Sequence, residues 1–469
     1  RHGDFEREMD PARKKRRVEG VAVVGKAHPY GVVPCGNLLL LSDGDRSAKM
    51  NAQRQSFGRF WRISMAESDP SANVALLNVL SFLGGAELGR MQLSSRAFYV
   101  FAAAPELWRD LCLRRNAPLA YLGSWKASFC RGRARNLRLR LYHNGLHRSW
   151  SCGNFELLPQ WFVQDDVPKV AAAGVTVDRF VEMYEKPNRP VVFQGLLEDW
   201  SARQNWADDA YLIAACGDAE LRATSPAAPM AVRFKLAEYL RYCRGPPQEE
   251  APLYVFERDF VQLCPKLKDD FHVPKYFDPF YQEPGEPASE KPRPTDLFRL
   301  YGERRRPDYR WLIIGSKLSG SVFHIDPNST NAWNACVRGR KRWILYPPGQ
   351  EPPPGVLPSS DGADVTLPLG LGEWFLSFWP YHEQRRSHPD PAMRPLEVTV
   401  EEGETIFVPH GWWHLVLNMD EVCIAITQNY VSASNVTNVL RFLRDKEDQI
   451  SGVRDRLQDG EEAEKDTAA

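Results

Sequence analysis

The chain has 469 residues, of which 43% are apolar and 26% are charged, and its 60 basic and 60 acidic side chains cancel. This length predicts two or three folded units, and the apolar content excludes a chain that is disordered throughout. The zero net charge indicates neither a nucleic-acid nor a membrane partner, and the absence of any apolar run of about 18 residues excludes a predicted membrane-spanning helix.

The N-terminal residues 1–68 alternate charged, glycine and short apolar stretches, and we expect them to be disordered. The basic run Arg13-Lys14-Lys15-Arg16-Arg17 has the composition of a nuclear-import signal, which a solvated basic tail shares. Nine scattered cysteines without a Cys-x-x-Cys pair are typical of reduced thiols rather than a zinc or disulfide framework. We therefore expect a nuclear protein, with the cytoplasm as the alternative.

Apolar residues at helical spacing predict three short helices in the next segment. The pattern covers 74–83 and 88–101, and it resumes after Pro105. Three helices of this length have little core of their own, so the bundle is expected to lean on a neighbouring domain or on a partner.

The spacing within residues 70–115 resembles the F-box family. The matching positions are Leu76, Leu77, Leu80, Ser81, Phe82, Leu83, Leu88 and Arg96, followed by Leu107-Trp108-Arg109. The family's usual Leu-Pro start is imperfect, because no leucine precedes Pro70. The resemblance implies that residues 69–116 form a small all-α F-box that docks on the Skp adaptor of a cullin–RING ubiquitin ligase. The alternative is an ordinary helical bundle packed on the next domain.

The segments that flank the second folded unit are polar. Residues 117–164 are predicted to be an Arg-rich connector whose arginines form a solvated or domain-bridging face, with direct nucleic-acid contact as the weaker alternative. After it, a helix around 180–184 and a buried strand over 190–193 begin a globular unit, in which 283–295 are an exposed loop. A helix is expected over 435–457, which could pair with a second copy, and the acidic tail is assigned to 446–469, so the two assignments overlap.

Short apolar runs at β spacing follow Trp311. They cover 311–314, 333–337, 342–346, 404–408, 414–417 and 422–427, and this number of short strands indicates a sandwich or barrel. The interval 347–400 is rich in Pro, Gly and polar residues, which predicts a long insertion over one end of that barrel.

A candidate metal site lies among these strands. Of the three His-x-Asp tripeptides in the chain, only His324-Ile325-Asp326 has strand-like neighbours. Residues i and i+2 of a strand point to one face, so His324 and Asp326 can reach one ion, with His410 or His414 as the third ligand. Two histidines and one carboxylate leave three positions open on an octahedral ion, which suits non-haem Fe(II) and O₂ chemistry.

Lys341 is the candidate partner for an anionic co-substrate. Alternation places it on the same face of a strand as Trp343 and Leu345, with Arg342 on the other face. If Trp343 and Leu345 face the barrel interior, Lys341 is buried there and needs an anion, such as the distal carboxylate of a metal-bound 2-oxo acid. The alternative places Lys341 outside the barrel.

These residues stand in motifs that resemble the JmjC family of 2-oxoglutarate/Fe(II) oxygenases, most closely its bifunctional arginine demethylase and lysyl-hydroxylase branch. The motifs are Phe323-His324-Ile325-Asp326-Pro327, Asn331-Ala332-Trp333-Asn334-Ala335, Lys341-Arg342-Trp343, Gly411-Trp412-Trp413-His414 and Ile424-Ala425-Ile426-Thr427-Gln428-Asn429. The similarity runs from about 165 to 432. It implies a mainly β fold, a double-stranded β-helix with helical decorations, as a JmjC domain over 165–445 with core strands at 311–430.

The resemblance also implies a role for each matching residue. It makes His324, Asp326 and His414 the Fe(II) ligands, and it makes Lys341 the partner of the 2-oxoglutarate distal carboxylate. Three further residues, Ser321, Asn334 and Thr427, would line the 2-oxoglutarate pocket.

Some positions depart from the branch. Ser321 stands where threonine is common, and either hydroxyl can donate to a carboxylate. One extra residue separates His414 from Thr427. His410 stands where a small residue is usual and is expected at the rim or in a structural role, and Trp412 and Trp413 are expected to pack.

The activity that the resemblance implies is oxidation of protein side chains with 2-oxoglutarate and O₂, supported by ascorbate. On a methylene carbon the product is a stable alcohol, and on an N-methyl group the product loses formaldehyde. The metal ligands do not choose the substrate, so lysyl hydroxylation and N-methyl-arginine or N-methyl-lysine demethylation both stay open, with histones or RNA-processing proteins as candidate substrates. The alternative function is an F-box substrate receptor that uses the JmjC fold as a binding module.

Overall fold

The computed structural model describes residues 28–34, 44, 48, 70–115, 120–132, 137–139, 141–226, 231–245, 249–285 and 292–453. The basic run at 13–17 and the acidic residues after 453 lie outside the described residues. Within the N-terminal segment that we expect to be disordered, β1 (Val32–Val33) pairs in parallel with β2 (Leu141–Tyr142). Val32 is 2% exposed, so burial of its side chain accounts for this departure from the expectation.

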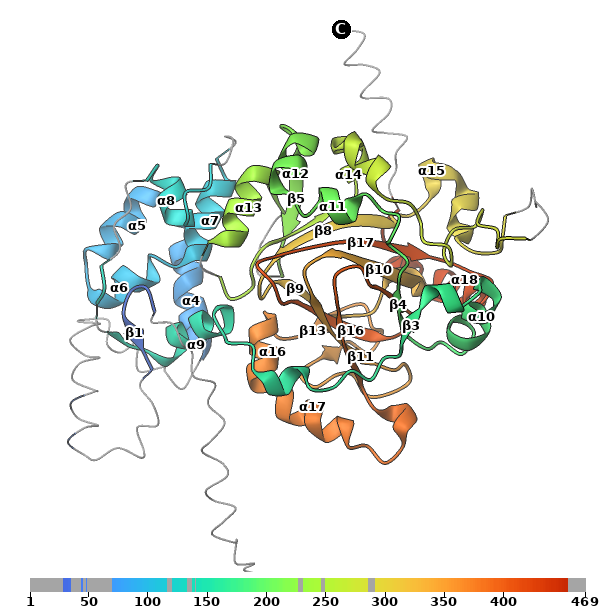
Figure 1. The fold of residues 1–469 in the computed structure, drawn as a ribbon. Coiled ribbons are helices and arrows are strands. Elements are labelled where there is room, and N and C mark those ends of the chain that lie inside the picture. The colour runs from blue at the N-terminus through green and yellow to red at the C-terminus, as the bar shows by residue number, and fades with distance from the viewer. Residues whose placement is uncertain are drawn as a thin grey trace, which may run out of the picture.

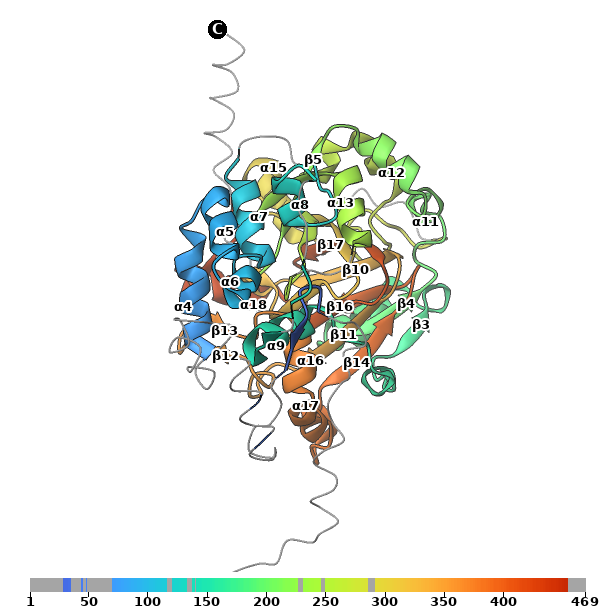
Figure 2. The same ribbon diagram turned by 90° about the vertical axis from the view of Figure 1, so that its left-hand side faces the viewer.

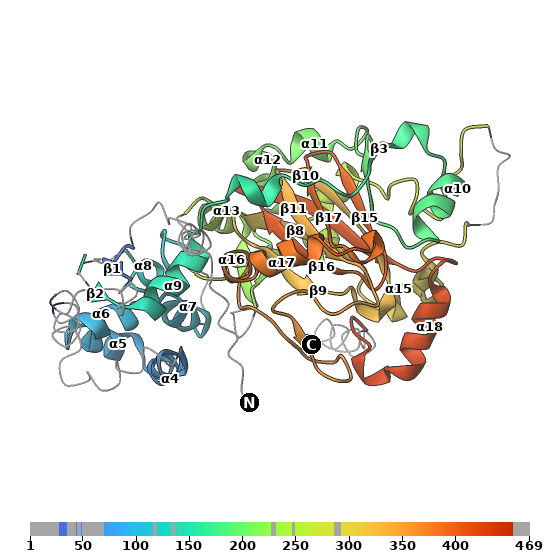
Figure 3. The same cartoon turned by 90° about the horizontal axis from the view of Figure 1, so that it is seen from below.

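The N-terminal unit is a small helical module, which lies to one side of the β domain (Figure 3). Its helices are α4 (Pro70–Ser81), α5 (Gly85–Gln92), α6 (Arg96–Phe101) and α7 (Pro105–Leu113). The first and last confirm the predicted helices, but the single helix predicted over 88–101 is wrong. The chain breaks there because the Ser95 side chain accepts a hydrogen bond from the backbone N–H of Phe98 and begins α6 as its N-cap.

The helical module packs against the β domain, as we expect of a bundle with little core of its own. The predicted connector contains α8 (Trp125–Phe129), α9 (Asn144–Gly153) and the short helix η4 (Pro159–Phe162). In α9, Arg148 Nη2 lies 3.2 Å from Glu373 Oε1 of the β domain, so this arginine bridges the two units. Deeper in the interface, Arg109 of α7 forms an ion pair with Glu249, and both side chains are 1% exposed.

Two β-sheets form the second unit, and Figure 1 shows the large sheet above the small one. The large sheet has the order β3-β4-β15-β10-β17-β8-β7-β5-β6 and the small sheet the order β14-β11-β16-β9. The large sheet comprises β3 (Lys169–Ala171), β4 (Val191–Gln194), β15 (Thr405–Val408), β10 (Asn331–Arg338), β17 (Val422–Tyr430), β8 (Arg310–Ser316), β7 (Tyr254–Glu257), β5 (Glu220–Thr224) and β6 (Val232–Lys235). The small sheet comprises β14 (Leu396–Val400), β11 (Lys341–Tyr346), β16 (Trp413–Asn418) and β9 (Gly320–His324).

Eight of these strands, β8 to β11 and β14 to β17, alternate between the sheets in the pattern of a double-stranded β-helix, except that β11 and β14 are neighbours in the small sheet. All six predicted strands are present, while β9 and β14 lie outside the predicted runs. The last part of the predicted insertion, 396–400, is therefore a core strand. Glu397 in this strand is fully buried, and burial cannot be predicted from a charged residue in the sequence, because such residues are usually exposed.

The rest of that insertion covers the outer face of the small sheet. It contains β12 (Leu357–Pro358), β13 (Val365–Thr366), α16 (Leu371–Ser377), α17 (Trp379–Arg386) and η10 (Pro391–Met393). Ile344 of β11 packs in one apolar cluster with Trp374 and Phe375 of α16. On the same face Arg342 is fully buried and forms an ion pair with Glu397. Arg342 and Ile344 thus share the face opposite Lys341, as alternation predicts.

Helices cover the other face of the large sheet (Figures 1 and 2). They are α11 (Ala202–Asn205), α12 (Asp209–Cys216), α13 (Leu236–Arg244) and α14 (Phe260–Leu263). Nearer the start of the domain, α10 (Val177–Phe180) and η6 (Val181–Glu185) confirm the helix expected around 180–184. Further short helices are η5 (Ala172–Gly174), η7 (Pro265–Asp270), η8 (Leu297–Tyr301), α15 (Gly302–Arg305) and η9 (Pro327–Ser329). The described parts of the 283–295 loop contain neither helix nor strand.

The helix predicted over 435–457 is wrong in its extent. In the structure α18 (Val436–Asp445) ends where Lys446 leaves helical geometry, and only the short η11 (Glu447–Gln449) follows. Within the described residues, no helix combines the length and the apolar character needed to cross a bilayer. The eight cysteines there are all free.

Candidate metal and co-substrate site

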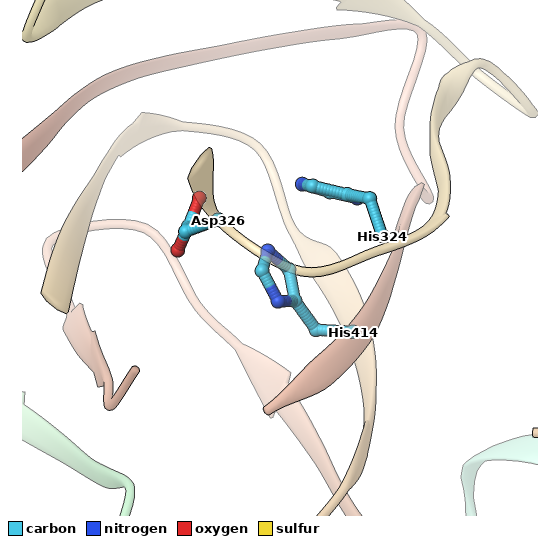
Figure 4. Close-up of side chains that lie close together, drawn as sticks. All are labelled: His324, Asp326 and His414. Carbon is cyan, nitrogen blue, oxygen red and sulfur yellow. The ribbon is translucent and has the colours of Figure 1, made fainter. Parts of the chain in front are cut away.

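Two adjacent strands of the small sheet bring the predicted metal ligands together. His324 ends β9 and is the direct cross-strand partner of His414 in β16, and Asp326 follows two residues after β9 ends. One potential ligand atom from each of the three residues lies within 4.8 Å of the others. Figure 4 shows the two imidazoles and the carboxylate converging on a common space. The third ligand of this cluster is His414 and not His410.

Backbone hydrogen bonds orient both imidazoles for metal binding. His324 Nδ1 lies 2.8 Å from the carbonyl oxygen of Val322, and His414 Nδ1 lies 3.1 Å from that of Trp412. A carbonyl oxygen can only accept, so each Nδ1 carries the proton and donates. Each Nε2 is then left with its lone pair free, which is the arrangement that metal-ligating histidines use.

The electrostatics of the cluster favour a bound cation. Burial lowers the pKa of His414 well below its ordinary value, and the nearby His324 lowers it further, so His414 is a neutral ligand near pH 7. Burial also raises the pKa of Asp326, although His324 and a hydrogen bond from Asn429 oppose the rise. A carboxylate in this setting gains from a divalent ion, and the donor set of two nitrogens and one oxygen fits Fe(II).

The metal ligands line a cavity of about 210 Å³ that also contains Lys341. Lys341 is 2% exposed and its Nζ donates to Asn418 Oδ1 at 2.7 Å. Trp343 lines the same cavity, so the structure places Lys341 inside the barrel, as alternation predicts. Among the described residues no carboxylate forms an ion pair with Lys341, which leaves its charge available to an anion from outside the chain.

The other predicted co-substrate residues line the same cavity. Asn334 of β10 and Thr427 of β17 are direct cross-strand partners, so the extra residue between His414 and Thr427 does not displace Thr427 from the site. Thr427 Oγ1 donates to the carbonyl oxygen of Trp333 at 2.9 Å, and the buried Oδ1 of Asn334 has no hydrogen-bond partner. Ser321 of β9 is hydrogen-bonded to Tyr254. The available Lys341 charge fits an anionic co-substrate, whereas the unpartnered Asn334 Oδ1 is an acceptor that only a hydrogen-bond donor can satisfy.

His410, Trp412 and Trp413 have the structural roles expected of them. His410 Nδ1 lies 3.2 Å from Asn331 Oδ1, and its other ring nitrogen bonds the Asn438 amide, so both nitrogens are engaged outside the cluster. Trp412 is 7% exposed and donates through Nε1 to a backbone carbonyl oxygen. Trp413 packs against the apolar cluster beneath α16.

The sequence did not indicate several residues of the cavity. Tyr254 and Phe256 of β7 and Trp311 of β8 form an aromatic wall beside the metal ligands, and the Phe256 and Trp311 rings stack with centroids 5.3 Å apart. The run Tyr254-Val255-Phe256 consists of aromatic and β-branched residues, which is a strand signal that could have predicted β7. Asn418, which accepts from Lys341, carries no signal in a single sequence.

Comparisons with known proteins agree with this architecture. Residues 177–435 match the family model of a cupin-like domain, and residues 73–114 match an F-box-like model. The chain is 37% identical over 448 residues to the arginine-specific demethylase JMJ22 of Arabidopsis thaliana, which covers 92% of this chain and 80% of that protein.

Two other similar proteins match a smaller share of the chain. The bifunctional arginine demethylase and lysyl-hydroxylase psr-1 of Caenorhabditis briggsae is 32% identical over 276 residues, which is 58% of this chain and 64% of psr-1. The 2-oxoglutarate and iron-dependent oxygenase JMJD4 of Homo sapiens is 29% identical over 304 residues, covering 60% of this chain and 66% of that protein. The chain thus spans just under two thirds of each of these two relatives.

Proposed function

The chain belongs to the cupin-like domain family, and we propose that it is a 2-oxoglutarate- and iron(II)-dependent dioxygenase that oxidises protein side chains. One observation carries this proposal: a cluster of two histidines and one aspartate shares a cavity with a buried lysine that has no anionic partner among the described residues. The names of the similar proteins, an arginine demethylase and a 2-oxoglutarate- and iron-dependent oxygenase among them, support it.

The predicted site residues of the cavity then have distinct roles in the reaction. His324, Asp326 and His414 hold Fe(II), which together with 2-oxoglutarate and O₂ supplies the oxidation of a C–H bond. Lys341 pairs with the distal carboxylate of 2-oxoglutarate, and the Asn334 NH₂ group and the Ser321 hydroxyl are the further donors that the cavity offers to its oxygens, since the Thr427 hydroxyl already donates to Trp333. The backbone carbonyls at Nδ1 keep both imidazoles in the ligating tautomer throughout.

For the protein substrate we propose methyl-arginyl side chains first and lysyl side chains second. The aromatic wall of Tyr254, Phe256 and Trp311 suits an aliphatic side chain that ends in a cation. The arginine demethylase JMJ22 matches 92% of the chain, helical module included, which favours demethylation over hydroxylation as the first assay. The basic run at 13–17 supports a nuclear location, where histones and RNA-processing proteins carry methyl-arginyl and lysyl side chains. A fluorescent fusion in which these five residues are changed to alanine should lose its nuclear location.

The activity test uses purified protein with Fe(II), ascorbate, 2-oxoglutarate and a methyl-arginyl peptide. The expected products are succinate and formaldehyde, and His324→Ala abolishes both. His388→Ala is the matched control, because His388 begins another His-x-Asp tripeptide that lies outside the cavity. Absence of turnover on methyl-arginyl and lysyl peptides, with no 2-oxoglutarate binding by calorimetry, contradicts the proposal.

A second function, docking on a Skp adaptor, is favoured by the surface of the helical module. Three apolar side chains there are strongly exposed: Val79 at 62%, Phe82 at 86% and Leu93 at 87%. Exposed apolar side chains of this size are available to a protein partner. Leu80 and Trp108, by contrast, are 1% and 2% exposed and belong to the core, so their replacement would unfold the module.

The docking test therefore changes the surface and leaves the core intact. Phe82→Asp is expected to abolish co-purification of a recombinant Skp adaptor with the full chain. The control is Leu369→Asp, because Leu369 is an exposed apolar residue of the β domain. Equal capture of the adaptor by the parent chain and by Phe82→Asp contradicts docking through this face.

A further inference from the structure

The chain that follows α18 runs across the loop that carries Asp326. We name residues 446–453 the C-terminal strap. The side chain of Asn328, two residues after Asp326, pairs with the backbone of the strap at Ser451: Asn328 Nδ2 donates to the Ser451 carbonyl oxygen at 2.9 Å, and Asn328 Oδ1 accepts from the Ser451 N–H at 3.1 Å. Asn328 is 3% exposed while Ser451 is exposed, so the buried side chain reaches out to the strap at the surface.

The loop at this point has an unusual backbone. Asn328 and the next residue, Ser329, both have φ of +56°, in the left-handed region that residues with a Cβ rarely adopt. Such a conformation persists where neighbouring groups hold it, and a second contact does so here. Asn435, a fully buried residue at the start of α18, donates through Nδ2 to the Ser329 carbonyl oxygen at 3.1 Å.

The strap is itself held at both ends. At its start, Lys446 Nζ and Gln449 Nε2 donate to the carbonyl oxygen of Asp361, in the turn between β12 and β13, at 2.8 and 3.2 Å. At its end, the carbonyl oxygen of Gly452 accepts from the backbone N–H of Asp308 at 2.8 Å. The strap therefore links the Asp326 loop to two segments of the domain that are far apart in sequence.

Asp326 needs such support more than the two histidines do. His324 and His414 lie in paired strands, so the sheet positions them. Asp326 follows the end of β9, and its described side-chain partner is Asn429. The direction in which its carboxylate points depends on the path of residues 325–329, which is held by the contacts to Ser451 and Asn435 and by Thr330, whose Oγ1 donates to the Pro327 carbonyl oxygen at 2.8 Å.

We propose that the C-terminal strap positions the metal centre, with Asn328 and Asn435 as positioning residues that orient Asp326. This inference rests on the proposed function, because it presupposes that the cluster binds a metal. Contacts one step removed from a metal ligand typically change metal affinity by about 10- to 100-fold, so the strap should do the same.

Two truncations of the full chain form a matched pair. Ending the chain after Asp445 removes the strap, and ending it after Val453 keeps the strap and removes only the residues beyond it. The probe is Co(II), measured by calorimetric affinity and by its visible absorption spectrum, which reports ligand geometry. The chain ending at Asp445 should bind Co(II) at least about tenfold more weakly, with an altered spectrum. The chain ending at Val453 should bind as the parent does.

A substitution isolates the contact from the rest of the strap. Asn328→Gly removes the side chain that binds Ser451 and still permits a φ of +56°, so the loop can keep its backbone path while losing its tether. It should show the same weakening of Co(II) binding even if the shorter truncation fails to fold.

The outcomes separate this inference from the proposed function. If Asn328→Gly and the chain ending at Asp445 bind Co(II) as tightly as the parent, the strap does not position the centre and the proposed function stands. If the parent itself does not bind Co(II), or binds it equally well after His324→Ala, the proposed function fails and this inference with it.

Discussion

Replacing Lys341 by methionine separates a co-substrate role from a structural role. The side chain is 2% exposed, and its one hydrogen bond in the structure goes to the neutral Asn418 amide. Methionine has a similar volume and no charge. Without the ammonium, the distal carboxylate of 2-oxoglutarate would enter the cavity unpaired, while the iron ligands stay in place.

The expected magnitudes differ between the two forms of the protein. Loss of one partner from a buried charge pair costs about 2–5 kcal/mol, which weakens 2-oxoglutarate binding from about 30-fold to a few thousand-fold. In the ligand-free protein, Lys341→Met removes the desolvation cost of the buried ammonium, and this gain offsets the loss of its hydrogen bond to Asn418. The free energy of unfolding should therefore change by no more than about 1 kcal/mol.

The assay is denaturant unfolding with and without saturating 2-oxoglutarate and Mn(II), since a ligand that binds only the folded state raises its stability. Arg340→Met is the control, because Arg340 is the exposed neighbour that pairs with Asp420. The variant Lys341→Met should lose the stabilisation by 2-oxoglutarate, and Arg340→Met should keep it. Retained stabilisation in Lys341→Met, or a loss of about 3 kcal/mol or more without ligand, would refute the reasoning.

Three further predictions concern the interface, acid sensitivity and substrate binding. Arg109→Met removes the cationic partner of the buried Glu249, which keeps only its hydrogen bonds from Trp125 and Tyr242, so it should lower the free energy of unfolding by about 3–5 kcal/mol. Adding Glu249→Gln should recover part of the loss in the same denaturation assay. Burial lowers the pKa of His143 from 6.5 to about 4. Between pH 6.5 and about 4 the unfolded chain therefore binds a proton at His143 that the folded chain does not. The free energy of unfolding should fall by up to about 1.4 kcal/mol for each unit by which the pH falls. In His143→Asn the dependence of this free energy on pH should be weaker, and an unchanged dependence would contradict the reasoning. Trp311→Leu should raise the Michaelis constant for a methyl-arginyl peptide at least severalfold and leave that for the co-substrate nearly unchanged, and the reverse pattern would contradict a substrate role for the aromatic wall.

The sequence predicted the strands whose side chains are apolar and the site residues that those strands carry. Alternation along β11 predicted that Lys341 shares a face with Trp343 and that Arg342 lies on the other, because a strand turns successive side chains to opposite faces; the structure shows that the Lys341 face is the inner one. The same rule predicted that His324 and Asp326 reach one ion, and the two do lie in one cluster, although Asp326 lies beyond the end of β9 and not in the strand that the rule assumes. The selection of His414 over His410 came from the family resemblance, and the structure agrees with it.

The features that the sequence did not predict depend on contacts between distant residues. β14 was missed because the buried charge of Glu397 is compensated by Arg342, more than fifty residues earlier in the chain. The single helix predicted over 88–101 ignored the capping ability of Ser95, a local signal that was available. The strap could not be predicted at all, since the pairing of Asn328 with Ser451 joins residues 123 positions apart.

The central claim is that the His324, Asp326 and His414 cluster drives oxidation of protein side chains with 2-oxoglutarate. Its most direct test is mass spectrometry of proteins that the His324→Ala variant traps from nuclear extract, before and after treatment with the parent protein, Fe(II) and 2-oxoglutarate. The account predicts that arginine peptides lose the mass of a methylene group or that lysine peptides gain that of an oxygen atom, only when 2-oxoglutarate is present. Trapped proteins whose masses stay unchanged under these conditions, with no succinate formed, would contradict it.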